Sequence, residues 1–268
     1  MLPVKKIYID TRYKTPDSIS NSRFKYELPS SVLLPDDTVF YIDDICIPHS
    51  WYTIETNIND KFYISVYEFP NTSIYTDYII TLESKTYTGA DLATELQAQL
   101  NTLVPAVFTV TYLASKHVIS IVCSSTTKVF KVLTYNDIIQ TYNINDPNDT
   151  TDIFKLSVGY SPFYDITNPF ISGPLSLQPI RNIYISSPNL GCFNTMGPRG
   201  EWNIIKKVPV SADYNQMIFD QVITNMDYLD CSRQSLKTIE FHLKDVNGNF
   251  IPLHGANVSF SVVFNKLT

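Results

Sequence analysis

Alternating apolar and polar residues near the C-terminus constrain the fold more than any other feature of this chain. Leu236–Lys244 and Ala256–Phe264 each place apolar side chains on every second residue. A period of two puts successive side chains on opposite faces of a strand, so both segments are predicted to be half-buried β-strands. The residues between them, Asp245–Asn249, contain an Asn-Gly pair that favours a tight hairpin turn. The sequence therefore predicts a β-hairpin near the C-terminus.

Further short strands are predicted along the chain, separated by Pro, Asn and Asp residues. They are Ile7–Ile9, Phe24–Leu28, Val39–Pro48, Lys61–Tyr67 and Ile183–Ile185. The 268-residue chain is 44% hydrophobic and only 17% charged, so it can bury a sizeable core. Strands of this length and spacing are typical of antiparallel sandwiches. The predicted fold class is therefore mainly β, a β-sandwich of two antiparallel sheets.

One segment changes from strand periodicity to helix periodicity. Its leucines follow one another at helical spacing, at Leu92, Leu96, Leu100 and Leu103. Thr88 is a suitable N-cap because Asp91 stands three residues later, near the positive end of the helix dipole. Pro105 closes the segment, so a helix is predicted at about 89–103.

This helix is predicted to belong to a small α+β insertion containing one helix. We place the insertion at 81–160 and the sandwich in the discontinuous domain 1–80 and 161–268. A hairpin is expected in Phe108–Cys123, after the helix. Asn136–Asp152 is polar and rich in Asn and Asp, so it is predicted to be a mobile loop.

The charge is unevenly distributed. A formal net charge of −6 argues against a dedicated nucleic-acid binder. Residues 1–25 nevertheless carry six basic residues against Asp10 and Asp17, which makes that segment +4 and the remainder −10. The basic residues are Lys5, Lys6, Arg12, Lys14, Arg23 and Lys25. A basic arm that touches a polyanion and an ordinary solvated terminus both fit this pattern.

Sequence signatures of catalysis, metal binding or membrane insertion are not found. No run of about 18 apolar residues is present, so no membrane span is expected. The histidines lack metal-ligand spacing, and the cysteines lack a paired motif and are expected to be reduced thiols. These residues are His49, His117, His242, His254, Cys46, Cys123, Cys192 and Cys231. No cofactor is predicted, and a hydrolase that uses Cys231 or His242 is a distant alternative.

Seven stretches together carry a family resemblance through their order and spacing. They are Tyr8–Tyr13, Ser20–Phe24, Tyr41–Trp51, Asn182–Ser187, Gly197–Glu201, Ile204–Val210 and Leu253–Phe260. In combination they resemble the minor capsid, or penton, proteins of Polinton (Maverick) elements and virophages. The resemblance covers both ends of the chain and most of its length.

The resemblance implies a structural capsid protein without enzymatic activity. It implies a single jelly-roll of two four-stranded sheets that assembles as a homopentamer at the fivefold vertices of an icosahedral particle. The neighbours would be trimers of a double jelly-roll major capsid protein, and the insertion would lie on the outer side. The implied location is the virion, with assembly inside the host cell and no secretion. A carbohydrate- or receptor-binding jelly-roll module is the alternative from another functional class.

Candidate interface residues follow from the symmetry that a ring of five copies needs. Such a ring requires one patch to meet a different patch on the next copy, with aromatic and Arg side chains as anchors. Arg12, Arg199 and Trp202 are the candidates, whereas Trp51 follows an apolar strand and is expected in the core. The basic residues Lys5, Lys6, Arg12 and Lys14 are expected to face the particle interior, where packaged nucleic acid or another capsid protein lies.

Overall fold

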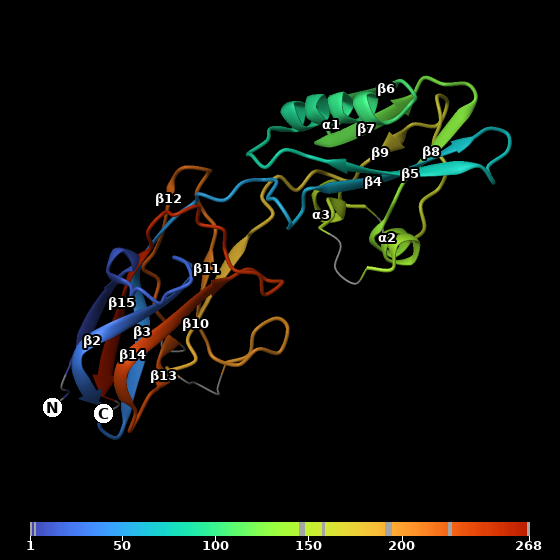
Figure 1. The fold of residues 1–268 in the computed structure, drawn as a ribbon. Helices are drawn as coiled ribbons and strands as arrows, with labels where there is room; N and C mark the ends of the chain where they lie inside the picture. Colours follow the sequence, from blue (N-terminus) through green and yellow to red (C-terminus); the bar gives the residue numbers. More distant parts are fainter. Residues whose placement is uncertain are drawn as a thin grey trace. The chain divides into compact units, whose positions relative to one another are not determined.

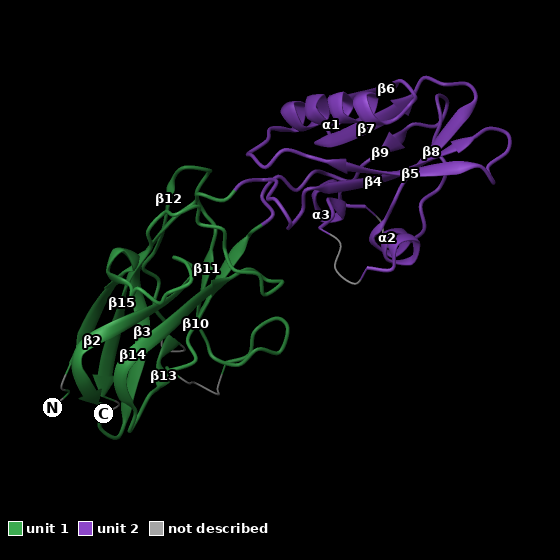
Figure 2. Cartoon of the chain, in the orientation of Figure 1, with its two compact units in different colours: residues 1–51, 180–268 green, residues 52–179 purple. Residues whose placement is uncertain are grey.

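The chain folds into two compact units, each with its own hydrophobic core. The computed structural model describes residues 2, 4–144, 148–156, 159–190, 195–224 and 227–266. Unit 1 comprises residues 1–51 and 180–268, and unit 2 comprises residues 52–179 (Figure 2). Unit 1 is therefore built from both ends of the chain, with unit 2 inserted between them.

Unit 1 consists of two sheets in which all neighbouring strands are antiparallel. The first sheet has the order β1 (Lys6–Asp10), β15 (Ser259–Lys266), β3 (Thr38–Pro48) and β12 (Met217–Asp220), and β13 (Leu229–Asp230) also pairs with β3. The second sheet has the order β11 (Ile204–Pro209), β10 (Asn182–Ser186), β14 (Ser235–Lys244) and β2 (Arg23–Leu33). A 3-10 turn, η1 (Thr11–Tyr13), follows β1.

The apolar side chains that alternate along the strands of both sheets face inward and form one shared core. Phe24 and Phe241 of the second sheet pack against Phe260 of the first, and the rings of Phe241 and Phe260 meet edge to face with centroids 5.0 Å apart. Sheets that pack in this way interdigitate their inner side chains and leave the outer faces polar. Trp51 is buried and stacks on His49, which confirms the expectation that it packs in the core.

The predicted hairpin between the last two strands is wrong. The turn itself forms, with Asp245 N donating to the Asn249 carbonyl at 2.9 Å and Gly248 at φ +86°. After the turn, however, the chain crosses to the other sheet, so β14 pairs with β2 and β10 while β15 pairs with β1 and β3. Ile251 and Val258 are buried along the crossing. The alternation showed which face of each strand is buried, but it carries no information about the partner strand.

In its described residues, unit 2 combines two three-stranded antiparallel sheets with three helices. One sheet has the order β5 (Tyr75–Thr81), β4 (Lys61–Glu68) and β8 (Lys128–Val132), and the other has the order β6 (Phe108–Leu113), β7 (Val118–Cys123) and β9 (Phe170–Ile171). The helices are α1 (Gly89–Leu103), α2 (Tyr135–Tyr142) and α3 (Thr151–Phe154) (Figure 1). Thr88 and Asp91 form a complete capping box at the start of α1, which spans the range predicted from the leucine spacing.

Unit 2 is larger than the insertion expected at 81–160. The sequence pattern assigned β4 and β5 to the sandwich because their alternation resembles that of the unit 1 strands. In the structure both strands belong to unit 2, where Phe62 and Ile64 of β4 and Ile80 of β5 pack against Leu96 of α1 in one core. Unit 2 also extends beyond residue 160, to residue 179. The first strand of unit 1 after it is β10, which begins at Asn182.

The stretch predicted to be a mobile loop contains helix α2. Thr134 and Asp137 form a second capping box, and Ile138 packs with Tyr63 and Leu133 in a small separate cluster. The expectations of a single helix and of a loop over Asn136–Asp152 are therefore wrong, although residues 145–147 lie outside the described part of the chain. The capping box and the buried Ile138 are short-range signals of a helix. They were missed because the segment is rich in Asn and Asp.

Replacing a ring at the centre of the sandwich tests this account of the core. The substitution Phe260→Ala removes contacts with both Phe24 and Phe241 and is expected to lower the free energy of unfolding of unit 1 by about 3–5 kcal/mol. Tyr13→Ala, at a side chain that is 74% exposed, is the matched control and should change it by less than about 0.5 kcal/mol. Denaturant unfolding followed by amide hydrogen exchange measures both. Equal effects of the two substitutions would contradict the packing described here.

Candidate assembly surface

The N-terminal residues form a strand of the sandwich and not a free basic arm. β1 pairs with β15 along its whole length, and Ile7 and Ile9 are buried in the core. Lys6 Nζ lies 2.7 Å from Asp44 Oδ2 and 3.2 Å from Asp43 Oδ2. Hydrogen bonding to Asp44, the largest influence, raises the pKa of Lys6 above its usual value. The positive charge of Lys6 is thus held on the surface of the first sheet.

Arg12 is also paired within unit 1. Its Nε lies 3.0 Å from Asp10 Oδ1, and its Nη2 lies 2.5 Å from Asp10 Oδ2. This hydrogen bonding holds the pKa of the Asp10 carboxyl below its usual value. Among the residues that the structure describes, no carboxylate lies within 4.0 Å of the amino groups of Lys5 and Lys14. The four cations expected to form one basic arm are therefore divided, two paired and two unpaired.

The first sheet presents exposed rings at both of its edges. Tyr8, on edge strand β1, is 72% exposed, and Phe219, on edge strand β12, is 66% exposed. Ile218 points into the core, so Phe219 points to the outer face, where it stands opposite Cys46 of β3. The Lys6 ammonium lies 5.3 Å from the centre of the Tyr8 ring. Exposed apolar side chains at both margins make this face a candidate surface for protein contacts.

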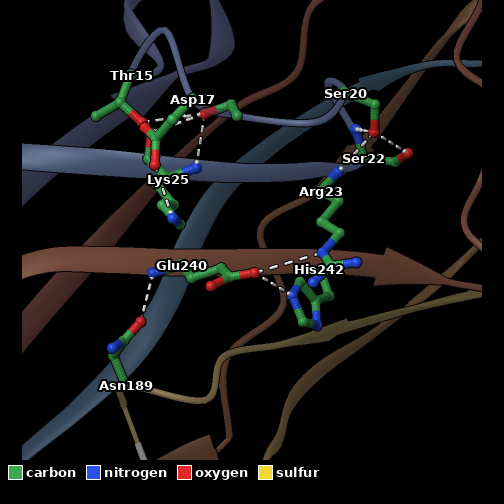
Figure 3. A network of polar contacts seen from close by, with 10 residues as sticks. Thr15, Asp17, Ser20, Ser22, Arg23, Lys25, Asn189, Glu240 and His242 are labelled. Carbon is green, nitrogen blue, oxygen red and sulfur yellow. Dashed lines mark hydrogen bonds and ion pairs between the residues drawn. The ribbon is translucent and has the colours of Figure 1, made fainter.

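On the outer face of the second sheet, a polar network ties β2 to β14. Figure 3 shows Arg23 and His242 converging on the carboxylate of Glu240, with contacts of 3.5 Å from Arg23 Nε and 2.8 Å from His242 Nε2. The backbone N–H of Glu240 donates to Asn189 Oδ1 at 2.7 Å. Hydrogen bonding from His242, followed by the opposing effect of burial, leaves the pKa of Glu240 below its usual value. Beside the network, Lys25 Nζ bonds Asp17 Oδ2 at 2.7 Å.

Arg199 joins two loops of unit 1. Its Nη1 donates to the carbonyl of Asn247, and its backbone N–H donates to Glu201 Oε2 at 2.9 Å. A methyl group at Gly248 would lie 2.7 Å from Arg199 Nη1, so only glycine leaves room for this contact. Trp202 follows the same loop, is 51% exposed and forms a bridge with Met196. Arg199 therefore has a carbonyl partner in its own chain, while the Trp202 ring is open to solvent.

Within the described residues, Arg12, Arg199 and Trp202 make separate contacts and do not form one cluster. Arg12 pairs with Asp10 beside β1, whereas Arg199 contacts the turn after β14. Sequence reasoning missed Phe219 because β12 has only four residues, too few for a periodic pattern to stand out. The alternation in Met217–Asp220, with Ile218 buried between two exposed apolar residues, is the signal that was available.

The described residues hold no group of three or more His, Cys, Asp or Glu side chains that could bind a metal ion. Cys46 and Cys123 are free thiols, and burial raises the pKa of both. Cys231 is buried, and its Sγ donates to the Thr38 carbonyl at 3.5 Å. Cys192 lies outside the described residues. Where the structure describes the chain, none of its helices combines the length and apolar character needed to cross a bilayer.

Comparison with known proteins gives a match in structure only. No family model matches the sequence, and no curated protein matches it. Among solved structures, the crystal structure of the selenomethionine-labelled mavirus penton protein matches with a TM-score of 0.55 and 12% sequence identity. The alignment covers 98% of this chain and 100% of the penton chain.

The chain shares the fold of a penton protein. Because the alignment takes in nearly all of both chains, the shared fold includes unit 1 together with the insertion. The sequence resemblance and the structural match thus agree on the fold. At 12% identity the match shows the fold alone.

A pair of glycine substitutions tests the contact between Arg199 and the turn after β14. Gly248 and Gly200 have φ values of +86° and +81°, so alanine at either position costs about 1 kcal/mol of backbone strain. Only Gly248→Ala also displaces Arg199, because nothing lies within 4 Å of the added methyl at Gly200. We expect Gly248→Ala to be less stable than Gly200→Ala by about 1 kcal/mol in denaturant unfolding. Equal stabilities would mean that the Arg199 contact contributes nothing.

The Glu240 network gives a pH dependence of definite sign. Because folding lowers the pKa of Glu240, its contacts stabilise the protein fully above about pH 4.5 and are lost as the pH falls through the lower folded value. Glu240→Gln is expected to cost about 1 kcal/mol at pH 7 and progressively less below pH 4. Glu27→Gln, in the exposed pair with Lys237 at 3.1 Å, is the control and should change little at any pH. A pH-independent loss in Glu240→Gln would contradict the assignment.

Proposed function

We propose that this protein is a structural capsid component that forms homopentamers at the fivefold vertices of an icosahedral virion. The observation that supports the proposal is the likeness to a penton protein over 98% of this chain and all of the other. The likeness takes in the inserted unit as well as the sandwich. The role is structural, without enzymatic activity.

The strand order of unit 1 supports a single jelly-roll within the sandwich. Counted along the chain, and leaving out β13, the eight strands lie in the orders 1-8-3-6 and 5-4-7-2. The first strand pairs with the eighth, the second with the seventh, the third with the sixth and the fourth with the fifth. This is the order of one long two-stranded ribbon wrapped around a core, as in the jelly-rolls of viral capsid proteins.

A ring of five copies needs two different contact surfaces on each copy. The two edges of the first sheet satisfy this requirement, since they differ in chemistry. The β1 edge offers the Tyr8 ring with the paired cation Lys6, and the β12 edge offers the apolar side chains of Met217 and Phe219. We assign these edges to the interface between copies, together with the exposed ring of Trp202.

The remaining partners follow from the same role. The particle would supply a double jelly-roll major capsid protein as the neighbour of each vertex. Lys5 and Lys14, the N-terminal lysines without a carboxylate partner in the described part of the chain, are the residues proposed to meet packaged nucleic acid. Because only two cations are available, such a contact would be weak and would depend on salt.

Solution mass tests both the assembly and the surface. Sedimentation of the purified full chain is expected to show a species with the mass of five chains at micromolar concentration. Phe219→Ser should weaken this association at least tenfold and leave the single chain folded, because the side chain is exposed in the single chain. Ile171→Ser, at an apolar residue of unit 2 that is 55% exposed, is the matched control and should leave the mass unchanged.

Two outcomes would count against these assignments. A stable monomer at every concentration would contradict self-assembly of the chain. Normal pentamers of Phe219→Ser would remove the β12 edge from the interface and leave the capsid role to be tested by co-expression with the matching major capsid protein. Electron microscopy of such particles, with and without this chain, then shows whether the vertices are filled.

A further inference from the structure

Unit 2 carries a group of aromatic side chains on the outer face of the sheet β5-β4-β8. Tyr67 of β4 stands opposite Tyr75 of β5, with ring centroids 5.0 Å apart and an interplanar angle of 26°. Phe163 meets Tyr67 edge-on, with centroids 4.9 Å apart. We call Tyr67, Tyr75, Phe163 and Lys131 of β8 the platform.

The backbone fixes Phe163 on this face. Phe130 and Tyr164 exchange two backbone hydrogen bonds, which places the segment around Tyr164 beside β8. The Tyr164 ring packs into the core of unit 2, against Phe130 and Phe170. Because successive side chains in an extended segment alternate, the Phe163 ring points to the opposite, outer face.

Part of the outer face is covered and part is open. Helix α2 covers the Tyr63 end of β4, where Tyr142 meets Tyr63 with centroids 5.2 Å apart. The platform lies further along β4 and keeps 54% of Tyr75 and 40% of Phe163 exposed. Large rings left exposed side by side on a sheet that already buries its other face suggest a binding surface.

The platform also holds a cation without an acidic partner. Lys131 Nζ lies 4.4 Å from the centre of the Phe163 ring and 5.7 Å from that of Tyr67. Across the described ranges of the chain, no carboxylate oxygen is found within 4.0 Å of Lys131, whereas Lys128 on the same strand pairs with Glu68 at 2.8 Å. A cation held over ring faces is well placed to receive an anionic group from outside.

Hydrogen-bonding groups lie in the adjacent row of the sheet. Ser65 stands between Asp77 and Lys131, and its hydroxyl donates to Asp77 Oδ1 at 2.5 Å. Residues two apart on a strand are separated by about 6.8 Å. The row of Ser65 and Asp77 is therefore about 6.8 Å from the row of Tyr67 and Tyr75, a distance similar to the size of a sugar ring. Ring faces, a cation and hydrogen-bonding oxygens therefore occur within two neighbouring rows.

We propose that the platform binds a carboxylated sugar. The apolar C–H face of a pyranose stacks on the electron-rich face of Tyr75 or Phe163, and the sugar carboxylate pairs with Lys131. Ser65 is buried, so of Ser65 and Asp77 only the partly exposed Asp77 carboxylate is open to accept a hydrogen bond from a sugar hydroxyl. A flat, open surface suits a sugar within a longer chain or at its end. This inference is independent of the capsid role proposed above, because it depends on unit 2 alone.

Calorimetric titration of the purified full chain tests the proposal with defined saccharides. Hyaluronan hexasaccharide supplies a uronate and sialyllactose supplies a sialate, so the two probes distinguish the sources of the carboxylate. Lactose is the neutral control. We expect one of the acidic probes to bind with at least tenfold higher affinity than lactose.

Two substitutions connect binding to the platform. Tyr75→Ala removes a stacking face and Lys131→Gln removes the charge, and each is expected to lower the affinity for the acidic probe at least tenfold. Tyr13→Ala and Lys116→Gln are the matched controls, an exposed tyrosine in unit 1 and an exposed lysine in the turn between β6 and β7, and should leave the affinity unchanged. Thermal unfolding of every variant verifies that it is folded.

Three results would overturn the proposal. The first is the absence of binding to either acidic probe at millimolar concentration by the folded protein. The second is binding that Tyr75→Ala and Lys131→Gln leave intact. The third is binding of polyglutamate that depends on Lys131 and not on Tyr75, which would assign the lysine to an acidic protein partner.

Discussion

Pairing of the first strand with the last is the contact on which unit 1 depends. β15 lies between β1 and β3, and Phe264 N donates to the Lys5 carbonyl at 2.9 Å, so the two ends of the chain complete one sheet. Joining segments so far apart costs entropy, although that cost rises only slowly with the length of the loop. The 128 residues of unit 2 lie between the two segments of unit 1. Because unit 2 has a core of its own, this long connection is a compact folded unit and not a flexible loop.

Local signals in the sequence predicted local structure well, and pairing between distant strands poorly. The spacing of Leu92 and Leu96 with the cap at Thr88 was sufficient for α1, because everything that defines a helix lies within a few residues. The alternation in β14 and β15 was equally clear, yet their partners are β2 and β1, more than two hundred residues away. Partner choice depends on the whole core, which no short window of sequence contains.

The surface was harder to predict than the core, for a related reason. Lys6 and Arg12 are both basic residues near the N-terminus. Lys6 forms an ion pair with Asp44 and Arg12 with Asp10, and only Asp10 is near its partner in sequence. Phe219 resembles any other aromatic residue until β12 is seen at the edge of a sheet with Ile218 pointing inward. Exposure and pairing are properties of the folded chain, so candidate sites on the surface required the structure.

The separate cores of the two units have a consequence for how such a protein can change over time. A substitution that disturbs packing around Phe260 is felt within the sandwich, whereas one around Leu96 is felt within the inserted unit. Selection can therefore act on the two bodies at different rates. A lineage could replace or remodel residues 52–179, and with them the surface chemistry of unit 2, while it keeps the sandwich of residues 1–51 and 180–268 unaltered.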